Sequence, residues 1–172
     1  MSTMQHTDFA KAKRFICMDI DREIRLAYAS QRNEFKAAVQ PFVIPLGGAN
    51  YLAALGLLSY TEFGGKLKYN ERKKNGSDFA SKNFNRFFDD LGAGYKQFRA
   101  SGTDVYDIFR CGLVHEYYAK ANCDIYMCKK KDKPIGIGVE PCGKYYFVVE
   151  TYFEDLKRAL DQLEKDCFNE IM

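Results

Sequence analysis

Apolar side chains recur every three or four positions through the first thirty residues, which is the spacing of one face of an α-helix. The repeat begins after Asp8, a residue type that caps helix N-termini, and charged residues fill the positions between. The repeat consists of Phe9, Ala12, Ile16, Ile20, Ile24 and Tyr28. We therefore expect a long amphipathic helix that ends ahead of Pro41 and Pro45. Residues 1–7, which include His6, are expected to form a flexible leader.

Two further helices are indicated between residues 50 and 91. Residues 50–63 are apolar on nearly every face, which predicts a buried central helix, and Gly64 and Gly65 are expected to end it. A charged loop, residues 66–76, follows. Ser77 is placed to cap the next helix. The expected core positions of that helix are Ala80, Phe84, Phe87, Phe88 and Leu91.

The remaining segments predict one more bundle helix, a small sheet and a final helix. The fourth helix is expected from Thr103 or Asp104 to about residue 121, with Phe109 and Leu113 on its apolar face. Short segments rich in Ile, Val and Tyr then predict an antiparallel β-hairpin or meander over residues 123–150. Thr151 and Glu154 form a capping box for the last helix. The predicted class is mainly α, a helical bundle with a small β appendage.

The composition is that of one folded domain spanning residues 1–172. Hydrophobic residues make up 47% and charged residues 28%, a balance typical of globular proteins. The N-terminus lacks the apolar region of a signal peptide, and the longest apolar stretch, residues 51–60, is too short to cross a bilayer. Six cysteines without a secretory signal are expected to be reduced thiols. We expect a cytoplasmic protein without a membrane segment, and we assign it no cofactor.

The most concentrated chemical signal is the segment Arg-Cys-Gly-Leu-Val-His-Glu-Tyr-Tyr, residues 110–118. Four residues separate Arg110 from His115, late in a predicted bundle helix. This segment resembles the motif of the HEPN superfamily, in which an Arg, four to six residues and a His lie near the end of such a helix. The resemblance implies a homodimeric, metal-independent ribonuclease with Arg110 and His115 as catalytic residues. It also implies RNA as substrate and, in defence or toxin–antitoxin systems, a neutralising antitoxin or regulatory protein as partner.

The chemistry of RNA cleavage fits these two residue types. Attack by the 2′-hydroxyl needs a base, an acid and a cation on the phosphorane; His transfers protons near neutral pH, and Arg holds two phosphate oxygens. A regular α-helix turns by about 100° per residue, so Arg110 and His115 would point about 140° apart. Either Gly112 permits a local distortion, or the same helix of a second subunit completes the site across a two-fold axis. The HEPN resemblance implies the second arrangement.

The neighbouring residues leave two alternatives open. Cys111 stands where the nuclease members of the superfamily usually carry Asn, Asp or His, which favours a non-catalytic HEPN-like domain that binds RNA, a nucleotide or a protein. Alternatively, Asp107 pairs with Arg110 along the helix and His115 is a partly buried structural residue. The chain would then be a helical interaction protein whose Arg–His spacing is accidental. The other side chains that could support a site here are Glu116, Tyr117 and Tyr118.

Two weaker signals lie outside this segment. Three cysteines near the predicted sheet could in principle bind zinc, but they are not spaced as CxxC. A fourth ligand would have to come from the Arg–His segment, so we predict no metal site. Those three are Cys123, Cys128 and Cys142. The lysines of residues 66–74 and 129–133 could form a rim that attracts phosphate, or simply a solvated surface.

Overall fold

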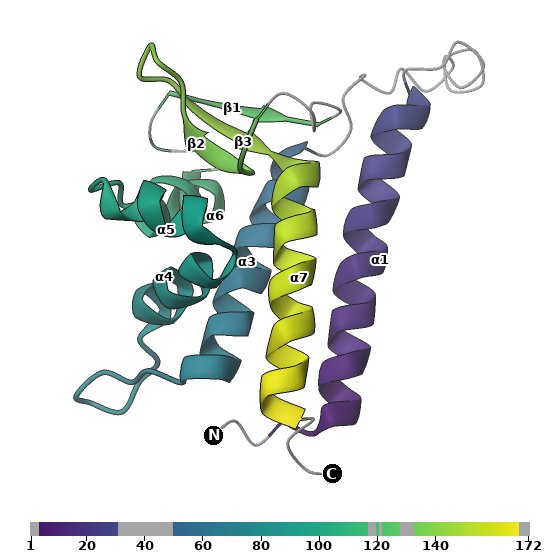
Figure 1. Cartoon of the computed structure of the whole chain (residues 1–172), viewed down its shortest axis with the longest axis vertical. Coiled ribbons are helices and arrows are strands. Elements are labelled where there is room, and N and C mark those ends of the chain that lie inside the picture. The colour runs from purple at the N-terminus through teal and green to yellow at the C-terminus, as the bar shows by residue number, and fades with distance from the viewer. Residues whose placement is uncertain (1–3, 31–49, 117–119, 121, 128–132, 169–172) are drawn as a thin grey trace.

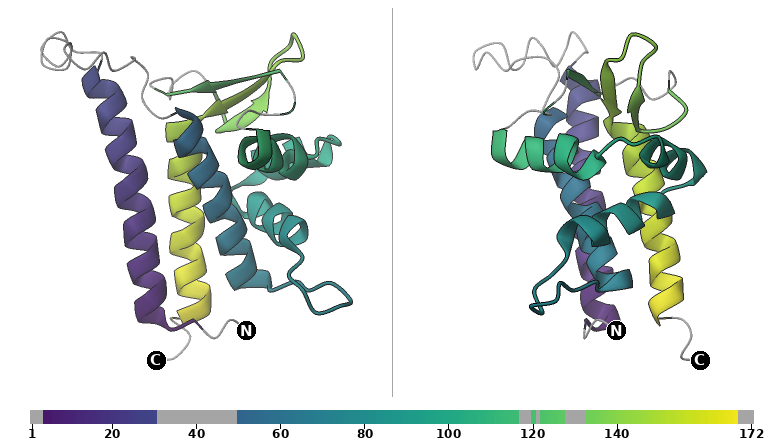
Figure 2. Two further views of the ribbon diagram at one scale, coloured as in Figure 1. Left: turned by 180° about the vertical axis from the view of Figure 1, so that it is seen from behind. Right: turned by 90° about the vertical axis from the view of Figure 1, so that its left-hand side faces the viewer.

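A computed structural model describes residues 4–30, 50–116, 120, 122–127 and 133–168. Its elements are α1 His6–Ser30, α3 Asn50–Tyr69, α4 Ala80–Asp90, α5 Ala93–Ala100, the π-helix η2 Tyr106–Cys111, α6 Gly112–Glu116, β1 Cys123–Tyr126, β2 Ile137–Val139, β3 Tyr145–Val148 and α7 Val149–Phe168. The long helices α1, α7 and α3 stand side by side, with the sheet at one end (Figure 1). Helices α4, α5 and α6 lie on the side of α3 away from α1 (Figure 2). The mainly helical class predicted from the sequence is confirmed.

The core forms where the three long helices meet and continues beneath α4 and the sheet. The repeat in α1 places Phe9, Ile16 and Ile20 inward, as predicted, whereas Tyr28 is exposed. Each fully buried side chain of this size stabilises the fold by about 1.5–3 kcal/mol, so α1 is held mainly by this one face. Among the described helices, none is both long and apolar enough to span a lipid bilayer.

The amino end of α1 is held against the carboxyl end of α7, so the predicted flexible leader is wrong for residues 6 and 7, which lie in the helix; residues 1–3 lie outside the described part. His6 Nε2 lies 2.9 Å from Oε1 of Glu164, and the His6 ring stacks on Phe168. Lys13 Nζ lies 2.6 Å from Oε2 of Glu164, and Lys13, followed by His6, lowers the pKa of that carboxyl. These partners are more than 150 positions apart in the chain, and a local pattern cannot show such contacts.

Gly64 and Gly65 lie inside α3, so the prediction that they end it is wrong. A Cβ at Gly64 would lie 2.5 Å from the Phe87 ring, and one at Gly65 would lie 2.1 Å from the carbonyl oxygen of Asn83. Both contacts are with α4, the helix that packs most extensively on α3. The two glycines therefore allow two helix backbones to approach closely.

Helix α4 begins at Ala80, and Ser77 does not cap it. The backbone N–H and the hydroxyl of Ser77 instead donate hydrogen bonds to Oδ1 of Asn75, at 3.1 and 2.7 Å. Of the core positions predicted for α4, Phe84, Phe87, Phe88 and Leu91 are buried and Ala80 is half-buried. Gly92, at a φ of 147°, separates α4 from α5.

The sheet is mixed, so the predicted antiparallel hairpin or meander is only partly right. Its strand order is β1-β3-β2, with β2 antiparallel and β1 parallel to β3. The central place belongs to β3 because Tyr146, Phe147 and Val148 are all buried, whereas β1 is half-buried throughout. Helix α7 follows β3 without a break at Val149, ahead of the predicted capping box at Thr151.

Candidate functional site

Residues 106–116 form two consecutive helical segments and not the single regular α-helix that was predicted. At the start, Oδ1 of Asp104 accepts a hydrogen bond from the N–H of Asp107 at 3.0 Å. The N–H of Gly112 donates to the carbonyl of Asp107, five residues back, as in a π-helix. The separation of about 140° between Arg110 and His115 applies only to a regular α-helix, and the first steps of this stretch are π-helical. Such turns are rare and frequently occur at functional sites.

Arg110 is tied to α3 by an ion pair with Glu62. Arg110 Nε lies 2.8 Å from Glu62 Oε2, and the two side chains are 20% and 24% exposed. The Arg110 guanidinium also lies 5.7 Å from the ring centre of Tyr106. Burial raises the pKa of the Tyr106 phenol, and the Glu62 carboxylate adds to this effect. Within the described residues no nitrogen of Arg110 forms a hydrogen bond, and its buried Nε meets Glu62 Oε2 as an ion pair only.

Glu62 was not singled out from the sequence, although a signal for it exists. It is the only acidic residue in α3, a helix that is apolar over most of its length. A lone carboxylate in such surroundings needs a cationic or hydrogen-bonding partner. Asp107, the partner suggested for Arg110 by spacing, pairs instead with Nζ of Lys120 at 2.7 Å. The Arg110 ion pair therefore crosses between elements and does not run along one helix.

His115 is exposed on α6, together with Val114 and Glu116. In the described part of the chain its ring takes part in no hydrogen bond or ion pair. His115 is therefore not a buried structural histidine, and its ring is open to solvent or to a ligand. No hydrogen bond joins it to Arg110 within these residues. Tyr117 and Tyr118 lie outside the described residues.

The cysteines near the segment are unreactive in character. Cys111 is half-buried, and burial raises the pKa of its thiol. Burial also raises the pKa of Cys123 to about 12. Both are thus neutral thiols near pH 7, and Cys111 supplies neither a base nor a charge to the site. Cys128 lies outside the described residues, and among those described no group of three His, Cys, Asp or Glu side chains could hold a metal ion.

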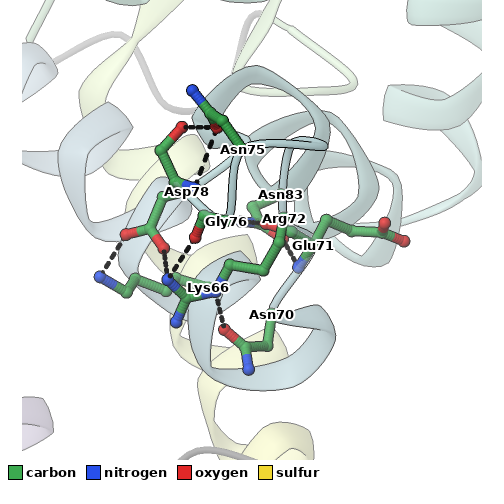
Figure 3. A network of polar contacts seen from close by, with 9 residues as sticks. Lys66, Asn70, Glu71, Arg72, Asn75, Gly76, Asp78 and Asn83 are labelled. Atoms are coloured by element: carbon green, nitrogen blue, oxygen red, sulfur yellow. Dashed lines mark hydrogen bonds and ion pairs between the residues drawn. The ribbon is translucent and has the colours of Figure 1, made fainter.

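Three of the five described lysines of the expected phosphate-attracting rim form ion pairs with carboxylates. Lys66 Nζ lies 2.5 Å and Arg72 Nη1 2.7 Å from the oxygens of Asp78 (Figure 3). Lys68 pairs with Asp90 at 3.1 Å, and Lys133 pairs with Glu140. Lys73 and Lys74 pair with no carboxylate in the described part. Residues 129–131 lie outside it.

A cavity of about 250 Å³ lies between α1 and α7, on the far side of α3 from α6. Its lining consists of Asp21, Ile24, Tyr28, Glu150, Phe153, Glu154 and Lys157. It shares no residue with the Arg110–His115 segment, so the candidate site does not lie in this cavity.

Comparison of the chain with protein-family models, with curated proteins and with solved structures finds no match. The functional argument therefore depends on the residues of this chain and on the resemblance of its Arg–His segment.

Proposed function

We propose that the chain is a HEPN-like, metal-independent endoribonuclease that acts as a homodimer in the cytoplasm. The observation that supports this most directly is that His115 is exposed while Arg110, five residues before it, forms an ion pair with Glu62. Arginine presents five N–H donors, and engaging Nε leaves the terminal nitrogens to bind a phosphate. Glu62 is thus a positioning residue for Arg110.

The proposed reaction is a transesterification. The 2′-hydroxyl loses its proton to a base and its oxygen attacks the adjacent phosphorus, while the P–O bond to the 5′-oxygen breaks and that oxygen takes a proton. Arg110 stabilises the negative charge on the phosphorane. One His115 provides one proton transfer at a time, and the His115 of a second subunit would provide the other. The products carry 2′,3′-cyclic phosphate and 5′-hydroxyl ends.

The test is cleavage of single-stranded RNA by purified protein in the presence of EDTA. His115→Ala should reduce the rate by about 10²–10⁴, the usual loss when a general acid–base is removed. Arg110→Ala should impair cleavage and binding together. His6→Ala is the matched control, because His6 is the only other histidine and begins α1 at the end of the bundle away from the sheet. Equal trace activity in the wild type and in His115→Ala would refute the catalytic proposal.

A second candidate is a HEPN-like domain that binds RNA, a nucleotide or a protein without cleaving it. The Glu62 carboxylate beside Arg110 favours it, because a negative charge there reduces the positive potential that a phosphorane needs, and the neutral Cys111 thiol adds no positive charge. An antitoxin or regulatory protein that covers the exposed His115 would fit either candidate. RNA binding by the wild type without any cleavage would select the binding function.

A further inference from the structure

A net positive charge lies between α3 and α4. Residues 66–82 hold six Lys or Arg and two Asp or Glu, a net charge of +4, whereas the whole chain carries +3. The rest of the molecule is therefore close to neutral. A local excess of this kind attracts polyanions and speeds their association.

The centre of this segment, residues 70–79, which includes most of the charged loop expected from the sequence, is a hairpin with one isolated β-bridge, between Arg72 and Asp78 (Figure 3). The backbone N–H of Lys73 donates to the carbonyl of Ser77 at 2.8 Å, and that of Phe79 donates to Glu71 at 3.0 Å. Gly76, at a φ of 81°, closes the three-residue turn, since a left-handed residue is required there. Asn75-Gly76 is the sequence signal that could have predicted this turn.

Polar contacts fix the base of the hairpin. Arg72 binds Asp78 and also donates from Nε to Asn70 Oδ1 at 3.2 Å. The side-chain amide of Asn83, in α4, makes two hydrogen bonds to the backbone of Glu71. Its Oδ1 accepts from the Glu71 N–H at 2.8 Å, and its Nδ2 donates to the Glu71 carbonyl at 3.2 Å. An ordered projecting loop costs conformational entropy, and such loops commonly carry function on a rigid support.

Two lysines that form no ion pair with a described carboxylate lie at the tip of the 70–79 hairpin. Lys73 and Lys74 are both exposed and, in the described part of the chain, neither has a carboxylate partner. Beside them Phe79 is 37% exposed, with Lys73 Nζ 5.9 Å from its ring centre. Unpaired cations next to an exposed aromatic ring are the combination that binds single-stranded nucleic acid.

The hairpin and the candidate site share one support. Glu62, which holds Arg110, and Tyr69, the last residue of α3, are about 10 Å apart along the helix axis at 1.5 Å per residue. In the right-hand view of Figure 2 the hairpin and α6 project from the same side of α3. We propose that the tip of the 70–79 hairpin binds the phosphate backbone of the single-stranded RNA whose scissile phosphate lies at Arg110. This inference rests on the proposed function.

The test compares two charge-matched double variants in a His115→Ala background, in which RNA stays intact. Lys73→Ala/Lys74→Ala removes the tip cations, and Lys11→Ala/Arg14→Ala removes two exposed cations from α1. Binding of a short fluorescein-labelled oligouridine is followed by anisotropy from about 50 to 200 mM salt. The hairpin variant should weaken binding about tenfold and reduce the salt slope by about 1.4, at about 0.7 per lost phosphate contact. The α1 variant should change affinity by less than about twofold.

Three outcomes would overturn the hairpin proposal. An equal loss in the two variants would show that only net charge matters, and an unchanged affinity of the hairpin variant would show that its tip makes no contact. Binding to phosphatidylserine-containing vesicles but not to the oligouridine would assign the tip to a membrane surface. The catalytic proposal is tested separately. It fails if His115→Ala leaves cleavage unchanged, and this can happen even when the hairpin variant binds RNA weakly.

Discussion

Arg110 Nε and Glu62 Oε2 lie 2.8 Å apart, and this contact joins the π-helix to the central helix α3. The pair is mostly shielded from water, so its charges interact more strongly than those of an exposed ion pair. Loss of one member therefore affects both the stability of the fold and the orientation of the other.

Glu62→Gln should lower the free energy of unfolding by about 1–3 kcal/mol, because a mostly buried guanidinium loses its charged partner. The chain has 12 Tyr and no Trp, so urea unfolding can be followed by tyrosine fluorescence. The control is Asp21→Asn, which breaks the exposed pair with Arg25 at 2.6 Å and should change stability by less than about 0.5 kcal/mol. Equal losses in the two variants would show that Glu62 and Arg110 form an ordinary surface pair.

Two glycines of the same helix should respond to alanine with opposite signs. Gly65→Ala places a methyl group 2.1 Å from the backbone oxygen of Asn83 and should destabilise the protein by about 2–3 kcal/mol. Gly56→Ala meets only side-chain atoms of Ile20 and Tyr60 at 3.6 Å, and alanine's higher helix propensity should stabilise the protein by about 0.5–1 kcal/mol. Thermal unfolding of both variants checks this. A stable Gly65→Ala protein would mean that α3 and α4 do not pack this closely.

The proposed homodimer should involve the exposed surface of α6. Val114 is 40% exposed beside His115 and supplies apolar area for a two-fold contact. Sedimentation at micromolar concentration should show a dimer for the wild type and a monomer for Val114→Arg, with loss of RNA cleavage. Val139→Arg, at a 49% exposed position on β2, should remain dimeric. A monomeric wild type would remove the two-subunit site from the mechanism.

Periodicity was sufficient to predict the helices whose buried faces repeat along one element. Phe9, Ile16 and Ile20 in α1 and Phe84 and Phe87 in α4 lie in the core for this reason. The sequence left open whether His115 is a partly buried structural residue, and in the structure it is exposed.

The errors arose where the partner is remote in the chain. Two consecutive glycines, Gly64 and Gly65, are typical of a helix end. Here they lie inside α3, where the absence of a side chain lets α4 pack closely against the helix backbone. Glu164 orders the start of α1 from near the other terminus. β1 runs parallel to β3 because β3, the most buried strand, takes the central place in the sheet. Which strand is central is a property of the assembled sheet and not of one segment.

Helix α7 continues directly from β3 and ends beside the first turns of α1. A helix of twenty residues is about 30 Å long, so α7 connects the sheet at one end to the Lys13–Glu164 ion pair at the other. Val148 and Val149 are consecutive, so the central strand of the sheet and the helix that contacts the first turns of α1 form one uninterrupted segment.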